Sequence, residues 1–176
     1  MIDRLESSEL SRRRSRAYGF GFQAVSSDSR PLVAIDIDGV IVLDDPPEVD
    51  ATLHEVTAWG MWRREVRIAV GTAEMIHQLA DRCEVAWATA WSYNAHEALR
   101  DALSLPAEPW AFLPVQFHAE AAVAEYARGR RWAWITESAA GPGEAPRDGG
   151  VIIAVDPRRG LPSVDLTSLL TELGVR

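Results

Sequence analysis

Short apolar runs rich in β-branched residues alternate with segments of helical periodicity, and this alternation constrains the fold more than any other feature. The runs that predict core strands are 32–37, 85–89, 132–135 and 151–155. The segments that predict helices are 72–82, 94–103, 118–127 and 166–173, and Thr72 is the expected N-cap of the first. Strands that alternate with helices favour a parallel sheet covered on both faces. We therefore expect an α/β fold built on a doubly wound, mostly parallel, Rossmann-like sheet.

Two segments depart from this rhythm. Residues 1–30 are polar and rich in arginine and serine, so we expect a tail outside the 31–176 domain. An alternative interpretation is a basic arm that makes weak contacts with nucleic-acid phosphates. Residues 44–71 contain two extended patterns, which predict a hairpin or flap. The chain between the first two core strands has room for this flap but not for a full cap domain.

Composition excludes several classes of protein. The net charge of −8 argues against nucleic-acid binding over the whole surface. No run of about 18 apolar residues is present, so we expect no membrane span. The single cysteine, Cys83, excludes an internal disulfide framework and a multi-cysteine zinc site. It is typical of a reducing compartment, and we expect a cytoplasmic protein.

The strongest local signal is a pair of acids at the end of the first predicted strand. Asp36 and Asp38 lie two positions apart and are followed by Gly39. Two carboxylates this close repel each other, and burial of an unpaired carboxylate costs free energy. A divalent cation resolves both problems, and oxygen ligands suit Mg²⁺. The alternative is that a carboxylate caps the following turn, as in any D-x-D-G loop.

Four stretches together resemble a known superfamily. In order along the chain they are Asp36-Ile37-Asp38-Gly39, Trp87-Ala88-Thr89-Ala90-Trp91, Ala133-Trp134-Ile135 and Val155-Asp156-Pro157-Arg158-Arg159-Gly160-Leu161. Over residues 31–172 the chain resembles the haloacid dehalogenase-like (HAD) phosphohydrolases, in particular small bacterial members with a minimal cap. The resemblance implies that Asp36 is a nucleophile that accepts a phosphoryl group and that Asp38 is the acid and base. It also implies Mg²⁺ as cofactor and a phosphate site at Thr89 and Ala90. The alternative for Thr89 is an ordinary hydroxyl at a strand end.

The departures from the family pattern fall on residues that carry its chemistry. The family uses a lysine to neutralise the phosphate, and all 18 basic residues here are arginine. By position, His118 stands where that lysine is expected, so we predict a catalytic and phosphate-binding role for it. The alternative is a helix cap or a surface histidine. The family's paired acids are replaced by Thr136 and Glu137, and we expect Glu137 to join Asp36 and Asp38 as a metal ligand. The alternative for Glu137 is a solvated loop acid.

Two further histidines and a tryptophan of the flap are interpreted mainly as structural residues. His77 and His96 lie in predicted helices, and we interpret them as surface or boundary residues. Trp62 lies in the predicted flap, where it either packs or covers a substrate.

Three functions follow from these observations. The first is a Mg²⁺-dependent phosphohydrolase that acts through an aspartyl-phosphate on a phosphorylated small molecule or macromolecule end. The second is a catalytically impaired relative that binds a phosphorylated ligand or a protein partner. The third is a phosphatase of nucleic-acid ends that uses the arginine arm for affinity, which predicts binding that weakens steeply with salt.

Overall fold

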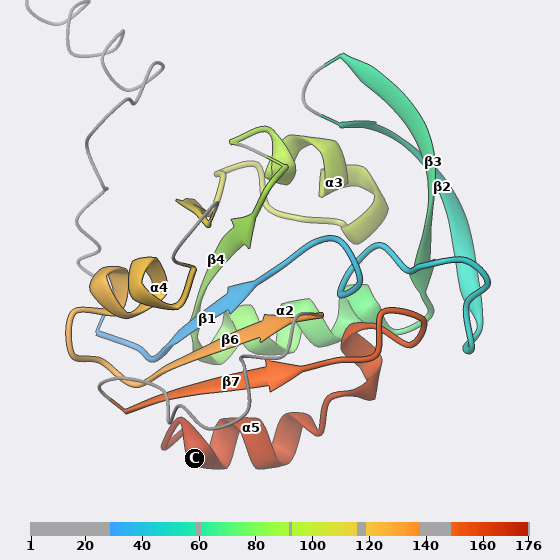
Figure 1. Cartoon of the computed structure of the whole chain (residues 1–176). Coiled ribbons are helices and arrows are strands. Elements are labelled where there is room, and N and C mark those ends of the chain that lie inside the picture. The colour runs from blue at the N-terminus through green and yellow to red at the C-terminus, as the bar shows by residue number, and fades with distance from the viewer. Residues whose placement is uncertain (1–28, 59–60, 92, 116–118, 138–148, 176) are drawn as a thin grey trace, which may run out of the picture.

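The computed structural model describes residues 29–58, 61–91, 93–115, 119–137 and 149–175. Five parallel strands form one sheet, two antiparallel strands form a separate hairpin, and helices cover both faces of the sheet (Figure 1). The predicted fold class is therefore confirmed. The expected N-terminal tail lies outside the described residues, except for Ser29 and Arg30. No helix within the described ranges is long and apolar enough to cross a membrane.

The five-stranded sheet has the order β5-β4-β1-β6-β7, so that the first strand lies at its centre. The strands are β1 (Leu32–Ile35), β4 (Glu84–Thr89), β5 (Ala111–Pro114), β6 (Trp132–Thr136) and β7 (Gly150–Ala154). β1 pairs in parallel with both β4 and β6. The chain therefore moves outward from β1 in both directions, which makes the sheet doubly wound.

Side chains of the central strands alternate between two hydrophobic clusters. Val33, Ile35 and Trp87 belong to one cluster, with buried residues of α2, α3 and α5. Leu32 and Ala34 belong to the other, with buried residues of α4. This period of two is expected for strands covered on both faces. The helices are α2 (Thr72–Arg82), α3 (Ala95–Leu103), α4 (Ala119–Ala127) and α5 (Leu166–Glu172), and a short 3₁₀ helix, η2 (Leu161–Ser163), precedes α5.

The flap expected over residues 44–71 is a hairpin of β2 (Ala51–Ala58) and β3 (Trp62–Ala69). Figure 1 shows the hairpin on the side of the molecule toward which the strands of the main sheet point. Val56, Val66 and Ile68 are buried, and they anchor one face of the hairpin to the larger core cluster. The hairpin is therefore packed onto the domain and stands beside the carboxyl ends of the strands.

Two elements differ from the sequence-based expectation. The edge strand β5 was not predicted, because four residues between Pro109 and Pro114 are too few to show a period. Proline is tolerated there because an edge strand can lack a ladder donor. Helix α2 spans the predicted residues, but its N-cap is Gly71, with φ of 90°, rather than Thr72.

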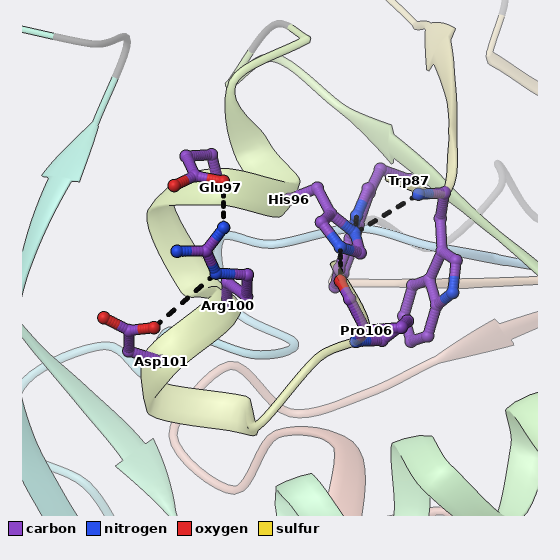
Figure 2. Close-up of polar contacts among 7 residues, drawn as sticks. Trp87, His96, Glu97, Arg100, Asp101 and Pro106 are labelled. Carbon is purple, nitrogen blue, oxygen red and sulfur yellow. Dashed lines mark hydrogen bonds and ion pairs between the residues drawn. The ribbon is translucent and has the colours of Figure 1, made fainter. Parts of the chain in front are cut away.

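The interpretation of His96 as a surface or boundary residue was wrong. Its side chain is buried under β4 and the loop after α3. Its Nδ1 accepts a hydrogen bond from Trp87 Nε1 at 3.3 Å, and its Nε2 lies 2.8 Å from the carbonyl oxygen of Pro106 (Figure 2). The histidine therefore joins α3 to its neighbours through both ring nitrogens. This use of both nitrogens is a structural role.

Candidate functional site

The candidate site lies where the three central strands end. Asp36 directly follows β1, and the last residues of the two flanking strands are Thr89 and Thr136. Since these strands are parallel, their carboxyl ends meet at one edge of the sheet. An acid is thereby placed between two buried hydroxyl groups.

Asp36 is half-buried and held by several donors. Its Oδ1 accepts a hydrogen bond from the Ile37 amide at 2.7 Å, and its Oδ2 accepts one from Thr136 Oγ1 at 3.4 Å. The Thr89 hydroxyl also donates to this carboxylate. Burial raises the pKa of Asp36 from 3.8 to about 6, against the lowering effect of the Ile37 amide and the Thr89 hydroxyl. Near neutral pH the carboxylate is therefore mostly ionised, as a nucleophile requires.

Asp38 is held by an indole. Trp91 Nε1 donates a hydrogen bond to Asp38 Oδ2 at 2.9 Å, and Trp91 is fully buried at the end of β4. The Trp91 amide in turn lies 3.3 Å from Thr89 Oγ1 and donates to it. An indole N–H donates and cannot accept a hydrogen bond. Any proton that Asp38 carries in this arrangement therefore resides on its other oxygen, Oδ1.

Glu137 lies directly over the loop between the two acids and β2. Gly39 has a φ of 71°, and a Cβ atom added to it would lie 2.6 Å from the Glu137 Cβ. Only glycine combines this backbone conformation with so close an approach. Glu137 is exposed, and the partial desolvation of its carboxylate, followed by repulsion from Asp44 and Asp38, raises its pKa. Glu137 is therefore part of the same negatively charged group as Asp36 and Asp38.

The segment after β7 supports the loop that carries Asp38. The Leu161 amide donates to the Val40 carbonyl at 2.8 Å, and the Asp44 amide donates to the Pro157 carbonyl at 2.9 Å. A Cβ atom added to Gly160 would lie 2.7 Å from the Val40 oxygen, so glycine is needed for this contact as well. The two distant segments therefore form one backbone-bonded unit.

The carboxylates of the site suit a hard divalent cation. In the part of the chain that the structure describes, no three His, Cys, Asp or Glu side chains lie close enough to hold a metal ion by themselves. Asp38 and Glu137 both raise the pKa of Asp36 by repulsion, so the group is electrostatically strained without a counter-charge. The side-chain atoms that these carboxylates offer are all oxygens, and Mg²⁺ keeps several waters in protein sites. The residues present therefore fit Mg²⁺ with water in the remaining coordination positions.

Most of the predicted site residues lie together at the carboxyl ends of the central strands. One predicted residue lies outside the part of the chain that the structure describes. Asp36, Asp38, Thr89 and Glu137 are neighbours as described above, and Ala90 is exposed next to Thr89. His118 lies outside the described residues.

Sequence reasoning missed two partners of the acids, the Trp91 indole and the Thr136 hydroxyl. Trp91 lies two residues after β4 and Thr136 is the last residue of β6, and a position at a strand end is the signal that could have identified them. It also missed Arg64, whose guanidinium carbon lies 5.2 Å from the centroid of the Trp91 ring. The alternation of β3 could have placed this arginine on the inner face of the hairpin.

Comparison of the chain with protein-family models, with curated proteins and with solved structures finds no match. The function has to be inferred from the chemistry of the site.

Proposed function

We propose that the protein is a Mg²⁺-dependent phosphohydrolase that acts through an aspartyl-phosphate on Asp36. The observation that carries this proposal is the half-buried Asp36 carboxylate, which lies between two threonine hydroxyls beside a second, indole-anchored acid. The resemblance of the D-x-D-G stretch to HAD phosphohydrolases supports the same chemistry. A purely structural turn would need only one of these carboxylates.

In the proposed reaction, an Asp36 oxygen attacks phosphorus and the bond from phosphorus to the leaving oxygen breaks. Asp38 donates its proton to that oxygen, so the alcohol leaves neutral. Asp38, now ionised, takes a proton from water, and the resulting hydroxide attacks the phosphorus of the aspartyl-phosphate. Inorganic phosphate is released and Asp36 is restored, while the proton taken from water restores Asp38.

Two groups of residues would stabilise negative charge during these steps. Thr89 and Ala90 lie at the end of β4 beside Asp36, where the resemblance places the contacts with phosphate oxygens. Asp36, the Asp38 carbonyl and Glu137 would hold Mg²⁺, which would supply the positive charge that a phosphoryl group needs.

The test is hydrolysis of a generic aryl phosphate with Mg²⁺ or with EDTA. We expect Mg²⁺-dependent turnover by the wild type and at least a ~1000-fold loss in Asp36→Asn, since the amide cannot form the acyl phosphate. Asp101→Asn is the matched control, because this acid of α3 is 98% exposed and is not among the acids at the strand ends. Background rates in every sample, or equal rates for wild type and Asp36→Asn, would reject the hydrolase.

A second candidate is a binding module for a phosphorylated ligand or protein partner. The observations that favour it are the absence of lysine and the replacement of the family's first paired acid by Thr136. This candidate predicts that the protein binds orthovanadate or phosphate without turnover of any ester. Binding measured by calorimetry beside the assay above separates the two functions.

A further inference from the structure

Arg64 is the cationic side chain of the hairpin that reaches the candidate site. Its guanidinium carbon lies 5.2 Å from the centroid of the Trp91 ring, and the Trp91 Nε1 donates to Asp38. The Trp91 indole therefore lies between the Arg64 guanidinium and the Asp38 carboxylate. The contact is a cation–π interaction, which forms at the face of the ring.

Strand alternation explains why Arg64 and not its neighbour reaches the site. Arg64 shares one face of β3 with Val66 and Ile68, which are buried against the domain. Arg63 points to the opposite face, where it lies 3.6 Å from Glu55 across the hairpin. Adjacent arginines of one strand thus have different environments, one facing the site and one facing away from it.

A cationic side chain such as Arg64 would offset the negative charge of the site. Asp36 and Glu137 are the carboxylates that face the substrate in the proposed reaction, and a phosphate monoester adds up to two more negative charges. The chain has no lysine to offset them. Within the described ranges, no carboxylate pairs with Arg64 and no hydrogen bond occupies its N–H groups. The N–H groups of its guanidinium are therefore available to a phosphate, which they can bind through two parallel hydrogen bonds.

We propose that Arg64 binds the phosphate group of the substrate and supplies the positive charge that the absent lysine would provide. The inference deepens the proposed function and rests on it for the identity of the ligand as a phosphate ester. Trp91 has two roles in this arrangement: its face holds the guanidinium and its edge holds Asp38. The hairpin is then a wall of the substrate site.

The experiment compares Arg64→Gln with the matched control Arg63→Gln, which removes the same charge from the other face of the same strand. Two quantities are measured: KM and kcat for an aryl phosphate with Mg²⁺, and the dissociation constant of orthovanadate by calorimetry. We expect Arg64→Gln to raise KM and the vanadate dissociation constant about 10- to 100-fold, as for loss of hydrogen bonds to a charged group. Arg63→Gln should leave both unchanged, and Arg64→Lys should restore part of the loss. Because Arg64 is exposed, its replacement should lower the melting temperature only slightly, through loss of the contact with Trp91.

The outcomes separate this inference from the proposed function. If the wild type hydrolyses the ester and Arg64→Gln behaves like Arg63→Gln, the Arg64 inference fails and the hydrolase stands. If the wild type lacks turnover but Arg64→Gln alone weakens vanadate binding, Arg64 is a phosphate ligand of a non-catalytic site. If the wild type neither turns over the ester nor binds vanadate, both are wrong.

Discussion

At the scale of single residues, the state of Asp36 reflects a balance between burial and hydrogen bonding. Burial disfavours its charged form, whereas the Ile37 amide and the Thr89 hydroxyl favour it, and burial has the larger effect. The carboxylate is thus less stable in the folded protein than in water. Holding Asp36 as a carboxylate in this setting therefore costs folding stability.

Because burial of the Asp36 carboxylate lowers folding stability, we expect the stability of the metal-free protein to depend on pH. The pKa of Asp36 is about 6 in the folded state and 3.8 without the fold, so the unfolded chain releases its proton first as pH rises. Asp36 therefore lowers the free energy of unfolding progressively between about pH 4 and pH 6, by about 3 kcal/mol in total. Asp36→Asn removes this effect, so it should be as stable as the wild type near pH 4 and more stable at pH 7.

Denaturant unfolding in EDTA at several pH values measures this difference, since contributions of other groups cancel between the two proteins. Mg²⁺ should restore stability to the wild type at pH 7 and have less effect on Asp36→Asn. A stability difference that stays constant from pH 4 to pH 7 would show that Asp36 is not destabilised by burial.

Trp91 gives a second prediction at this scale. Its indole fixes one oxygen of Asp38, so Trp91→Phe keeps an aromatic ring but loses the hydrogen bond. Esters of alcohols need a proton on the leaving oxygen more than aryl esters do. We expect kcat to fall about tenfold or more for an alkyl phosphate and less for an aryl phosphate. Equal losses for the two substrates would mean that Trp91 does not position the proton donor.

At the scale of elements, the hairpin is divided by strand alternation into a face toward the site and a face toward solvent. Trp62 lies on the face of Arg64, beyond the buried residues of β3, and is 64% exposed. Leu53 is 55% exposed and lies on the opposite face, beside Arg67. The sequence left two interpretations of Trp62, packing or covering a substrate. Its exposure shows that it does not pack into the core.

From the exposed Trp62 on the inner face of the hairpin, we expect the protein to prefer phosphate esters with aromatic leaving groups. Trp62→Ala should raise KM for an aryl phosphate about 2- to 10-fold, the range expected for one aromatic contact, and leave KM for glycerol phosphate unchanged. Leu53→Ala is the control, because it removes a similarly exposed apolar side chain from the outer face. If both variants change KM alike, or neither does, the inner face does not contact the leaving group.

Elements with a strong local pattern could be predicted from the sequence. Helix α2 and strand β4 were located within one residue, because apolar residues recur at one clear period in each. Strand β5 has four residues at the sheet edge, which is too short for a period to appear. At the site, Asp36 and Asp38 could be placed because they directly follow a strand. The contacts of Trp91 and Arg64 could not, since they depend on how the hairpin packs against the sheet.

At the scale of the whole molecule, the site is assembled from segments far apart in the chain. β1 supplies the acids, β4 and β6 supply the hydroxyls, and the hairpin supplies the arginine. The segment around Gly160 closes the loop after Asp38 from the C-terminal side. Because Asp36 follows the central strand, groups from both neighbouring strands reach the same carboxylate. The account as a whole therefore rests on transfer of phosphorus to Asp36.

The most direct measurement is identification of the phosphorylated residue. The protein is mixed with an aryl phosphate and Mg²⁺ and quenched in acid, and its peptides are examined by mass spectrometry for an added phosphoryl group. The account predicts the group on Asp36 in the wild type, its absence in Asp36→Asn, and its loss on treatment with hydroxylamine, which cleaves acyl phosphates. Turnover without a phosphoryl group on Asp36, or with one on another residue, would contradict it.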